Sequence, residues 1–332
     1  PIVAGPRDHR IPLSFAQRRL WFLHKMDSDL IAYNMPISHR VKGPLNIATL
    51  QEAINRIIRR HEVLRTAVAE IDGEPVQQIQ PMAHFELPVV DLRRLSLHQA
   101  EKEALRIFNA DARQPFDCNK APLMRAKLLR LGAEDQLFIL NFHHLISDGA
   151  FLTVFYRELE IFYSAILAGK PAALPALAVQ YADFVLWQRD WLSEPGSASQ
   201  TRYWKARLGT NLQALDLPTD YERPTGQAYR GARIARRLSR ELSGALKQLS
   251  RRQGVTLFMT LLAALKILLS RMGGQKDVVV GATIAGRNRP ELDGLIGFYI
   301  NALALRTDLS GNPAFTDLLA RVRATCFDAY TH

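Results

Sequence analysis

The chain has 332 residues, of which 48% are hydrophobic and 23% charged, and a net charge of +11 at pH 7, a balance typical of a globular protein with room for two cores. Its longest apolar run, residues 257–269, is interrupted by Lys266 and is too short to cross a bilayer, and residues 1–10 do not resemble a signal peptide, so we expect neither membrane insertion nor secretion. Two cysteines, Cys118 and Cys326, are too few for a disulfide framework and have no metal-ligand spacing, so we expect a cytoplasmic protein without a metal site.

Apolar periodicity and turn residues predict a mixture of helices and strands before residue 143. In chain order these are a helix over 15–26 capped by Ser14, a strand over 37–41, a helix beginning at Asn46, a hairpin over 65–80 that turns at Asp72-Gly73, a helix over 96–112, and strands over 123–131 and 136–142. The last of these strands leads directly into the most informative stretch of the chain.

Residues 143–149 read H-H-L-I-S-D-G and are followed by a predicted helix over 151–167. Strand ends in α/β sheets are where ligand sites gather, and the imidazole pKa suits proton transfer near neutrality. A lone histidine near a strand end is more often structural. The spacing of two histidines, an aspartate and a glycine nevertheless favours a catalytic interpretation.

A boundary is predicted near residues 169–171, where glycine and proline cluster. Beyond it we expect an aromatic amphipathic segment over 181–192, a polar strand over 231–238, helices over 240–253 and 256–272, strands over 278–284 and 298–309, and a final helix over 313–330. Helices and strands alternate in both halves, so the predicted class is α/β or α+β with two lobes, residues 1–172 and 173–332.

The second lobe contains a basic segment. Its basic residues are Arg230, Arg233, Arg236, Arg237, Arg240, Lys247, Arg251 and Arg252, and they are accompanied by one acidic residue, Glu241. A solvated surface is the simpler interpretation, and a landing site for an acidic partner is the alternative. No nucleic-acid-binding motif or aromatic interleaving accompanies these charges, so nucleic acid is not an expected partner.

Taken together, the motifs resemble the condensation domains of non-ribosomal peptide synthetases. Five segments match the family's signatures in order: residues 14–21 (S-F-A-Q-R-R-L-W), 60–66 (R-H-E-V-L-R-T), 143–149 (H-H-L-I-S-D-G), 181–188 (Y-A-D-F-V-L-W-Q) and 296–303 (I-G-F-Y-I-N-A-L). Five signatures spread over most of the chain are far more specific than any one of them.

The resemblance implies two chloramphenicol-acetyltransferase-like lobes arranged as a V-shaped pseudo-dimer, with a tunnel at their junction. It implies that donor and acceptor carrier domains present their substrates as phosphopantetheine thioesters at the two mouths, that the acceptor amine attacks the donor carbonyl, and that an adenylation domain of the same synthetase is a neighbour. The domain itself is expected to bind no cofactor, because the phosphopantetheine belongs to the carriers.

The resemblance also assigns roles at the site. His144 is the candidate to hold the amine or take its proton, and Gly149 allows a tight turn and offers its backbone N–H to the oxyanion. His143 is expected to be structural. Asp148 could pair with His144 as in a hydrolase triad, but the family pairs this aspartate with an arginine, here Arg287.

Asn301, Ala150 and Phe151 are the expected tunnel residues. Ala150-Phe151 replace the family's usual Trp-Ser, which reshapes the pocket beside the reacting carbonyl and leaves the donor type open. Ala302 replaces a usual threonine. The family continues beyond the position of His332, so the second lobe is expected to be truncated.

Other functions remain open. One is starter-type N-acylation, in which the donor is a fatty-acyl group. Another is a non-catalytic, partner-recruiting domain of the same fold, which would be expected to have lost His144 or Asp148, although this chain has both. A stand-alone acyltransferase that uses a soluble thioester such as acetyl-coenzyme A would share His144 and Asp148 but not all five signatures. An epimerising relative is a further alternative, although the ending Ser147-Asp148-Gly149 favours condensation.

Overall fold

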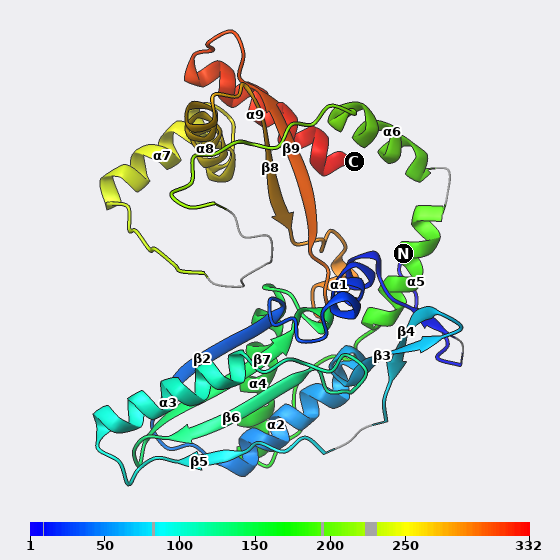
Figure 1. Cartoon of the computed structure of the whole chain (residues 1–332). Helices are drawn as coiled ribbons and strands as arrows, with labels where there is room; N and C mark the ends of the chain where they lie inside the picture. Colours follow the sequence, from blue (N-terminus) through cyan, green and yellow to red (C-terminus); the bar gives the residue numbers. More distant parts are fainter. Residues whose placement is uncertain (9, 82–83, 194–195, 223–230) are drawn as a thin grey trace. The chain divides into compact units, whose positions relative to one another are not determined.

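A computed structural model describes residues 1–8, 10–81, 84–193, 196–222 and 231–332 (Figure 1). The chain forms two compact units: unit 1 comprises Pro1–Trp191 and Ala285–Ile300, and unit 2 comprises Leu192–Ile284 and Asn301–His332. This division differs from the boundary expected after residue 172. The first unit takes in most of helix α5 (Tyr181–Ser193) and one segment of the second half, because both pack against the N-terminal part of the chain.

Unit 1 contains two sheets and five α-helices among the described residues (Figure 1). The strands are β1 (Ile11–Pro12), β2 (Asn34–Lys42), β3 (Thr66–Ile71), β4 (Glu74–Ile79), β5 (Val89–Asp91), β6 (Met124–Arg130) and β7 (Asp135–His143). The helices are α1 (Phe15–Met26), α2 (Ile47–Arg60), α3 (Leu97–Ala112), α4 (Phe151–Leu167) and α5 (Tyr181–Ser193). Nearly all the elements predicted before residue 192 are confirmed, and the two-residue β1 and three-residue β5 were too short to predict.

The larger sheet has the order β2-β7-β6-β5, so β7 lies inside it, antiparallel to both neighbours. Because side chains alternate along a strand, Phe138, Leu140 and Phe142 pack with α2 and α4, while Leu137 and Ile139 pack with α3 on the opposite face. Both faces of β7 are therefore covered, which accounts for its long apolar run.

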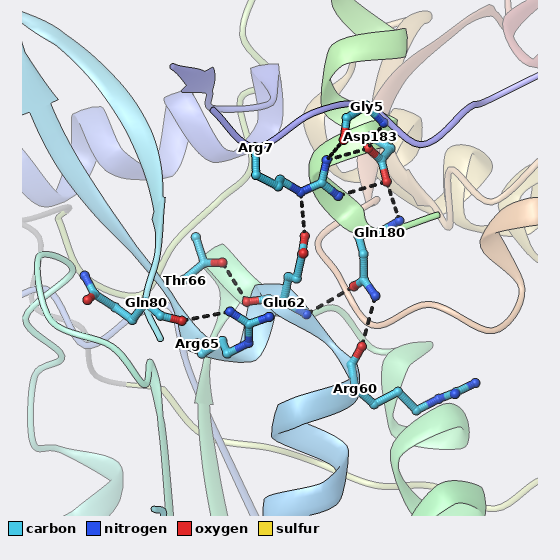
Figure 2. Close-up of polar contacts among 9 residues, drawn as sticks. All are labelled: Gly5, Arg7, Arg60, Glu62, Arg65, Thr66, Gln80, Gln180 and Asp183. Atoms are coloured by element: carbon cyan, nitrogen blue, oxygen red, sulfur yellow. Dashed lines mark hydrogen bonds and ion pairs between the residues drawn. The ribbon is translucent and has the colours of Figure 1, made fainter. Parts of the chain in front are cut away.

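A polar network fixes the start of α5 (Figure 2). The Arg7 guanidinium donates to Asp183 at 2.7 and 3.0 Å and to Glu62 at 2.9 Å. Asp183 also accepts the backbone N–H groups of Gly5 and Gln180, and the Gln180 side chain donates to the Arg60 carbonyl. The residues on both sides of Tyr181 are thus tied to the N-terminal segment and to the end of α2.

Residues 285–300 join the two strands of unit 2 but pack within unit 1, and we refer to them as the strap. The short helix η3 (Pro290–Leu292) lies in the strap. Leu292, Leu295, Ile296, Phe298 and Tyr299 are buried in the core of unit 1. The strand expected over 298–309 consequently begins three residues later, because residues 298–300 belong to the strap.

Unit 2 is built on the antiparallel pair β8 (Asp277–Ile284) and β9 (Asn301–Asp308). Its helices are α6 (Gly196–Leu208), α7 (Arg240–Arg252), α8 (Leu257–Gly273) and α9 (Phe315–Thr331). Apolar residues of α8, α9 and β9, including Leu262, Leu305 and Val322, form its core. The predicted polar strand over 231–238 is wrong, because these exposed residues form no strand pairing, and α6 was not predicted.

No described helix is by itself long and apolar enough to cross a membrane. The pair α7 and α8 meets that criterion only when the two are joined across their 102° bend.

Lys266 on α8 fastens the helix to both strands of unit 2. Its side chain is fully buried, and Nζ donates to the Val278 carbonyl at 3.1 Å, the Leu305 carbonyl at 2.5 Å and the Thr307 hydroxyl at 3.0 Å. Burial lowers the pKa of Lys266 to about 8 from its usual 10.5. Between these pH values the unfolded chain binds more protons at this position than the folded chain does.

Stability is therefore expected to rise with pH between about 8 and 10.5 by a contribution that Lys266→Met lacks. The measurement is the free energy of unfolding of both proteins across this window. The value for the wild type, relative to that for Lys266→Met, should increase as pH increases. A difference that does not change with pH would contradict the prediction.

Candidate active site

The two histidines lie where β7 ends and the short helix η2 (His144–Ile146) begins, and their side chains have different surroundings. His143 is 2% exposed and lies edge-on to the rings of Tyr33 and Phe116. Its Nδ1 accepts the Leu145 N–H at 3.1 Å, so its proton is on Nε2. Burial lowers the pKa of His143 to about 3, which keeps this ring neutral. The arrangement supports the structural role expected of His143.

His144 is only partly buried, between the rings of Tyr33 and Phe298. Its Nδ1 lies 3.0 Å from the Ser147 carbonyl oxygen, which can only accept, so Nδ1 carries the proton. Burial lowers the pKa of His144, against the opposing effects of this hydrogen bond and of the Asp148 carboxylate. At neutral pH the ring is therefore uncharged, with an unprotonated Nε2 that can accept a hydrogen bond or a proton.

Asp148 is fully buried and organises the loop that leads into α4. One carboxylate oxygen accepts the backbone N–H groups of Ala150 and Phe151, each at 3.0 Å, and the other accepts the Tyr299 N–H at 3.1 Å. Among the described residues, these hydrogen bonds and an ion pair with Arg287 are the contacts of the carboxylate, and the hydrogen bond of the His144 ring goes to Ser147. The geometry favours the loop-holding role over a hydrolase-type triad.

Arg287, on the strap, lies 3.6 Å from Asp148 through Nη2, so the expected pairing is present within unit 1. Nη1 donates to the carbonyls of Leu292 and Leu295 at 2.7 and 2.8 Å, and the guanidinium lies over the Tyr299 ring at 4.1 Å. Arg287 therefore holds the strap together while it offsets the buried charge of Asp148.

The residues after Asp148 lie differently from our expectation. Gly149 is exposed, its φ is outside the left-handed region, and a Cβ added to it would meet no atom of the described residues within 4 Å, so its conformation does not require glycine. Ala150 is exposed. Phe151 is fully buried against Phe142 and Phe155, so its ring belongs to the core of unit 1 and not to an open channel wall.

The other predicted residues lie in unit 2. Asn301 is the exposed first residue of β9, and its side-chain oxygen accepts the Ala302 N–H at 2.9 Å. Of the basic segment, Arg240, Lys247, Arg251 and Arg252 are exposed on α7. Arg233, Arg236 and Arg237 precede α7 and are also exposed, whereas Arg230 lies outside the described residues.

Gln17 is a site residue whose role sequence reasoning missed. Its side chain accepts the Ser14 N–H at 3.0 Å and donates to the Leu145 carbonyl at 2.8 Å. The capping box of α1 thus holds η2, the turn that contains His144. The signature S-x-A-Q contains both residues, but a bond to a backbone carbonyl leaves no pairing signal in the sequence.

Within the described residues, no three His, Cys, Asp or Glu side chains lie close enough together to hold a metal ion. The loop after β7 contains the His144 imidazole, the Asp148 carboxylate in its buried ion pair with Arg287, and backbone N–H and carbonyl groups. These are suited to proton transfer and to the binding of a polar substrate atom.

Comparisons with known proteins agree on one family. The family model for the condensation domain matches residues 7–332. One of the linear gramicidin synthase subunits of Brevibacillus parabrevis is 47% identical over 332 residues, which is 100% of this chain and 4% of that protein, so the chain spans a small part of the relative.

Solved structures show the same fold. The X-domain from teicoplanin biosynthesis, also solved in complex with OxyB, matches with a TM-score of 0.90 and 27% identity, covering 100% of this chain and 73% of that one. The first condensation domain of the CDA synthetase matches with a TM-score of 0.79 and 21% identity, covering 98% of this chain and 77% of that one. The expected chloramphenicol-acetyltransferase-like fold is confirmed.

Proposed function

The chain belongs to the condensation domains of non-ribosomal peptide synthetases, and on that premise we propose that it forms an amide between a carrier-bound acyl or peptidyl thioester and a carrier-bound aminoacyl group. The observation that supports this most directly is the state of His144. Its Nδ1–H donates a hydrogen bond to the Ser147 carbonyl, and its unprotonated Nε2 is the atom that can accept.

In the proposed reaction the amine nitrogen attacks the thioester carbonyl, the C–S bond breaks, and the proton lost by the amine ends on the departing thiol. The neutral His144 Nε2 accepts the hydrogen bond or proton of the amine, which favours the nucleophilic form. A thioester is already activated, so orientation together with this assistance is sufficient chemistry.

We further propose that both substrates arrive on phosphopantetheine arms of donor and acceptor carrier domains, that an adenylation domain is a neighbour, and that the domain binds no cofactor of its own. The size of the relative, of which this chain matches 4%, is consistent with a multidomain setting. A fatty-acyl starter is the alternative donor, because Ala150 and Phe151 stand where the family usually has Trp-Ser, which leaves the donor type open.

A second candidate function is the recruitment of a partner enzyme without catalysis. It is favoured by the TM-score of 0.90 with the X-domain, which has been solved in complex with OxyB. Two observations favour catalysis instead: the 47% identity with part of a gramicidin synthase and the unprotonated Nε2 of His144.

The deciding experiment is a condensation assay followed by mass spectrometry of the acceptor carrier. Donor carriers loaded with aminoacyl, peptidyl and fatty-acyl groups are each mixed with a loaded acceptor and the chain. An acceptor mass increased by the donor group supports the proposal and identifies the donor class. No transfer from any donor, together with measurable binding of a partner enzyme, would support the recruiting function instead.

A further inference from the structure

The strap is held by side chains from separate parts of unit 1, and besides the ion pair between Asp148 and Arg287, three of these side chains bond to its main chain. His61 Nδ1 accepts the Ile296 N–H at 3.4 Å, Tyr181 donates to the Phe298 carbonyl at 2.8 Å, and Asp148 accepts the Tyr299 N–H at 3.1 Å. The path of residues 296–299 is therefore fixed by three side chains that lie far apart in the sequence.

His61 is itself held in one orientation. Its Nε2 lies 2.9 Å from the fully buried Glu158, which also accepts from Arg60 at 3.0 Å. Burial lowers the pKa of His61, although Glu158 opposes this effect. The ring donates from Nε2 and accepts at Nδ1, so it bridges α4 and the strap.

Tyr181 makes the hydrogen bond to the strap that involves Phe298 itself, at its carbonyl. Its side chain is 1% exposed, and its hydroxyl also lies 3.0 Å from the Ser14 hydroxyl. Because a phenol has one proton and this proton goes to the Phe298 carbonyl, Ser14 must donate to Tyr181. The resulting chain of hydrogen bonds runs from the cap of α1 through α5 to the strap.

The strap passes very close to the Tyr181 ring. A Cβ added at Gly297 would lie 2.3 Å from Tyr181 Cδ2 and 2.7 Å from the Tyr299 ring, so only glycine fits there. The next residue, Phe298, places its ring centroid 5.6 Å from that of His144. The segment fixed by Tyr181 therefore forms one wall of the His144 environment.

We infer that Tyr181 is a positioning residue for His144: its hydroxyl fixes the Phe298 carbonyl and thereby sets the packing of the Phe298 ring on the imidazole. The competing interpretation is that Tyr181 is a buried tyrosine whose hydroxyl needs a partner and which affects only stability. The inference rests on the proposed function of His144, but its main test does not depend on amide formation.

The test compares Tyr181→Phe with a matched control, Tyr163→Phe, in the full chain. Tyr163 lies on α4, and its hydroxyl accepts the Asn46 N–H at 2.9 Å, so both variants lose one phenolic oxygen and keep the ring. Histidines are labelled with ¹³C at Cε1, and the NMR signal of His144 is identified by its absence in His144→Gln.

Tyr181→Phe is expected to shift the His144 signal and to raise the pKa of His144 towards its ordinary 6.5, because a loosened Phe298 lets water reach the ring. Tyr163→Phe should leave both unchanged. Asp148, whose charge acts on His144, and its partner Arg287 are the same in the two variants. If the wild type forms amides, the turnover of Tyr181→Phe should be lower by roughly 2- to 12-fold, the range for one hydrogen bond.

Phe298→Leu serves as a second variant, because it removes the ring but keeps the carbonyl bond to Tyr181. It should change the His144 signal in the same direction.

An unchanged His144 signal in Tyr181→Phe, with melting lowered as in Tyr163→Phe, would assign Tyr181 to the core alone and overturn the inference. A Tyr181→Phe chain that does not fold, together with an unchanged signal in Phe298→Leu, would overturn it too. Absence of amide formation by the wild type would count against the proposed function but not against the NMR result.

Discussion

Replacing His144 by alanine is expected to leave the chain folded and to slow amide formation by roughly a hundred- to ten-thousand-fold, the range for the loss of a positioned acid–base group. The side chain is only partly buried, and its own hydrogen bond is to the local Ser147 carbonyl, so its removal costs little packing. Thermal melting and single-turnover rates between loaded carriers measure the two effects separately.

The pH dependence of the wild type provides a second measurement. The neutral ring predominates above the pKa of His144, which burial lowers, so the rate should hold below the ordinary histidine value of 6.5 before it falls in acid. His98→Ala, which removes an exposed histidine on α3, is the control. Equal rates for His144→Ala and the wild type would remove His144 from the mechanism.

Replacing Asp148 by alanine is expected to cost about 3–5 kcal/mol of folding free energy, because it leaves a buried arginine without its counter-charge. The loss also removes the acceptor for three backbone N–H groups, at Ala150, Phe151 and Tyr299. The melting temperature should fall by roughly 6–20 °C, at 2–4 °C per kcal/mol for a domain of 150–250 residues. Differential scanning calorimetry measures this.

Asp91→Ala is the matched control. Asp91 also pairs with an arginine, Arg93, but this pair is exposed, so its loss should change the melting temperature little. Arg287→Ala should destabilise the chain as Asp148→Ala does, because the other member of the buried pair then stays charged and unpaired. Melting of Asp148→Ala at the wild-type temperature would show that the ion pair does not hold the loop.

Much of the fold was predictable because its elements carry strong local patterns. The long apolar run of β7 and the stripe on α2, Leu50 to Ile58, each follow the period of their element. The wrong and missing predictions of secondary structure have physical causes as well. Residues 231–238 alternate weakly but find no strand to pair with, and α6 has little apolar periodicity and few buried contacts to predict.

The candidate site was predictable only where chemistry coincides with a motif. The positions of His143, His144 and Asp148 at the end of β7 follow from the sequence, and the pairing with Arg287 follows from the family resemblance. The burial of Phe151 and the roles of Gln17 and Tyr181 could not be predicted, since the first depends on packing with Phe142 and the others act on main-chain carbonyls.

The bonds that fasten the strap have a consequence for redesign. Proline apart, which lacks the N–H, a peptide N–H or carbonyl is the same whichever side chain the residue carries, so these bonds place no other chemical demand on the side chains at positions 296, 298 and 299. Position 298 can therefore be exchanged for residues of similar volume without unfastening the main chain. It offers a replaceable surface on one side of the imidazole, opposite Tyr33, through which we expect the acid–base properties of His144 to be adjustable while the main chain stays in place.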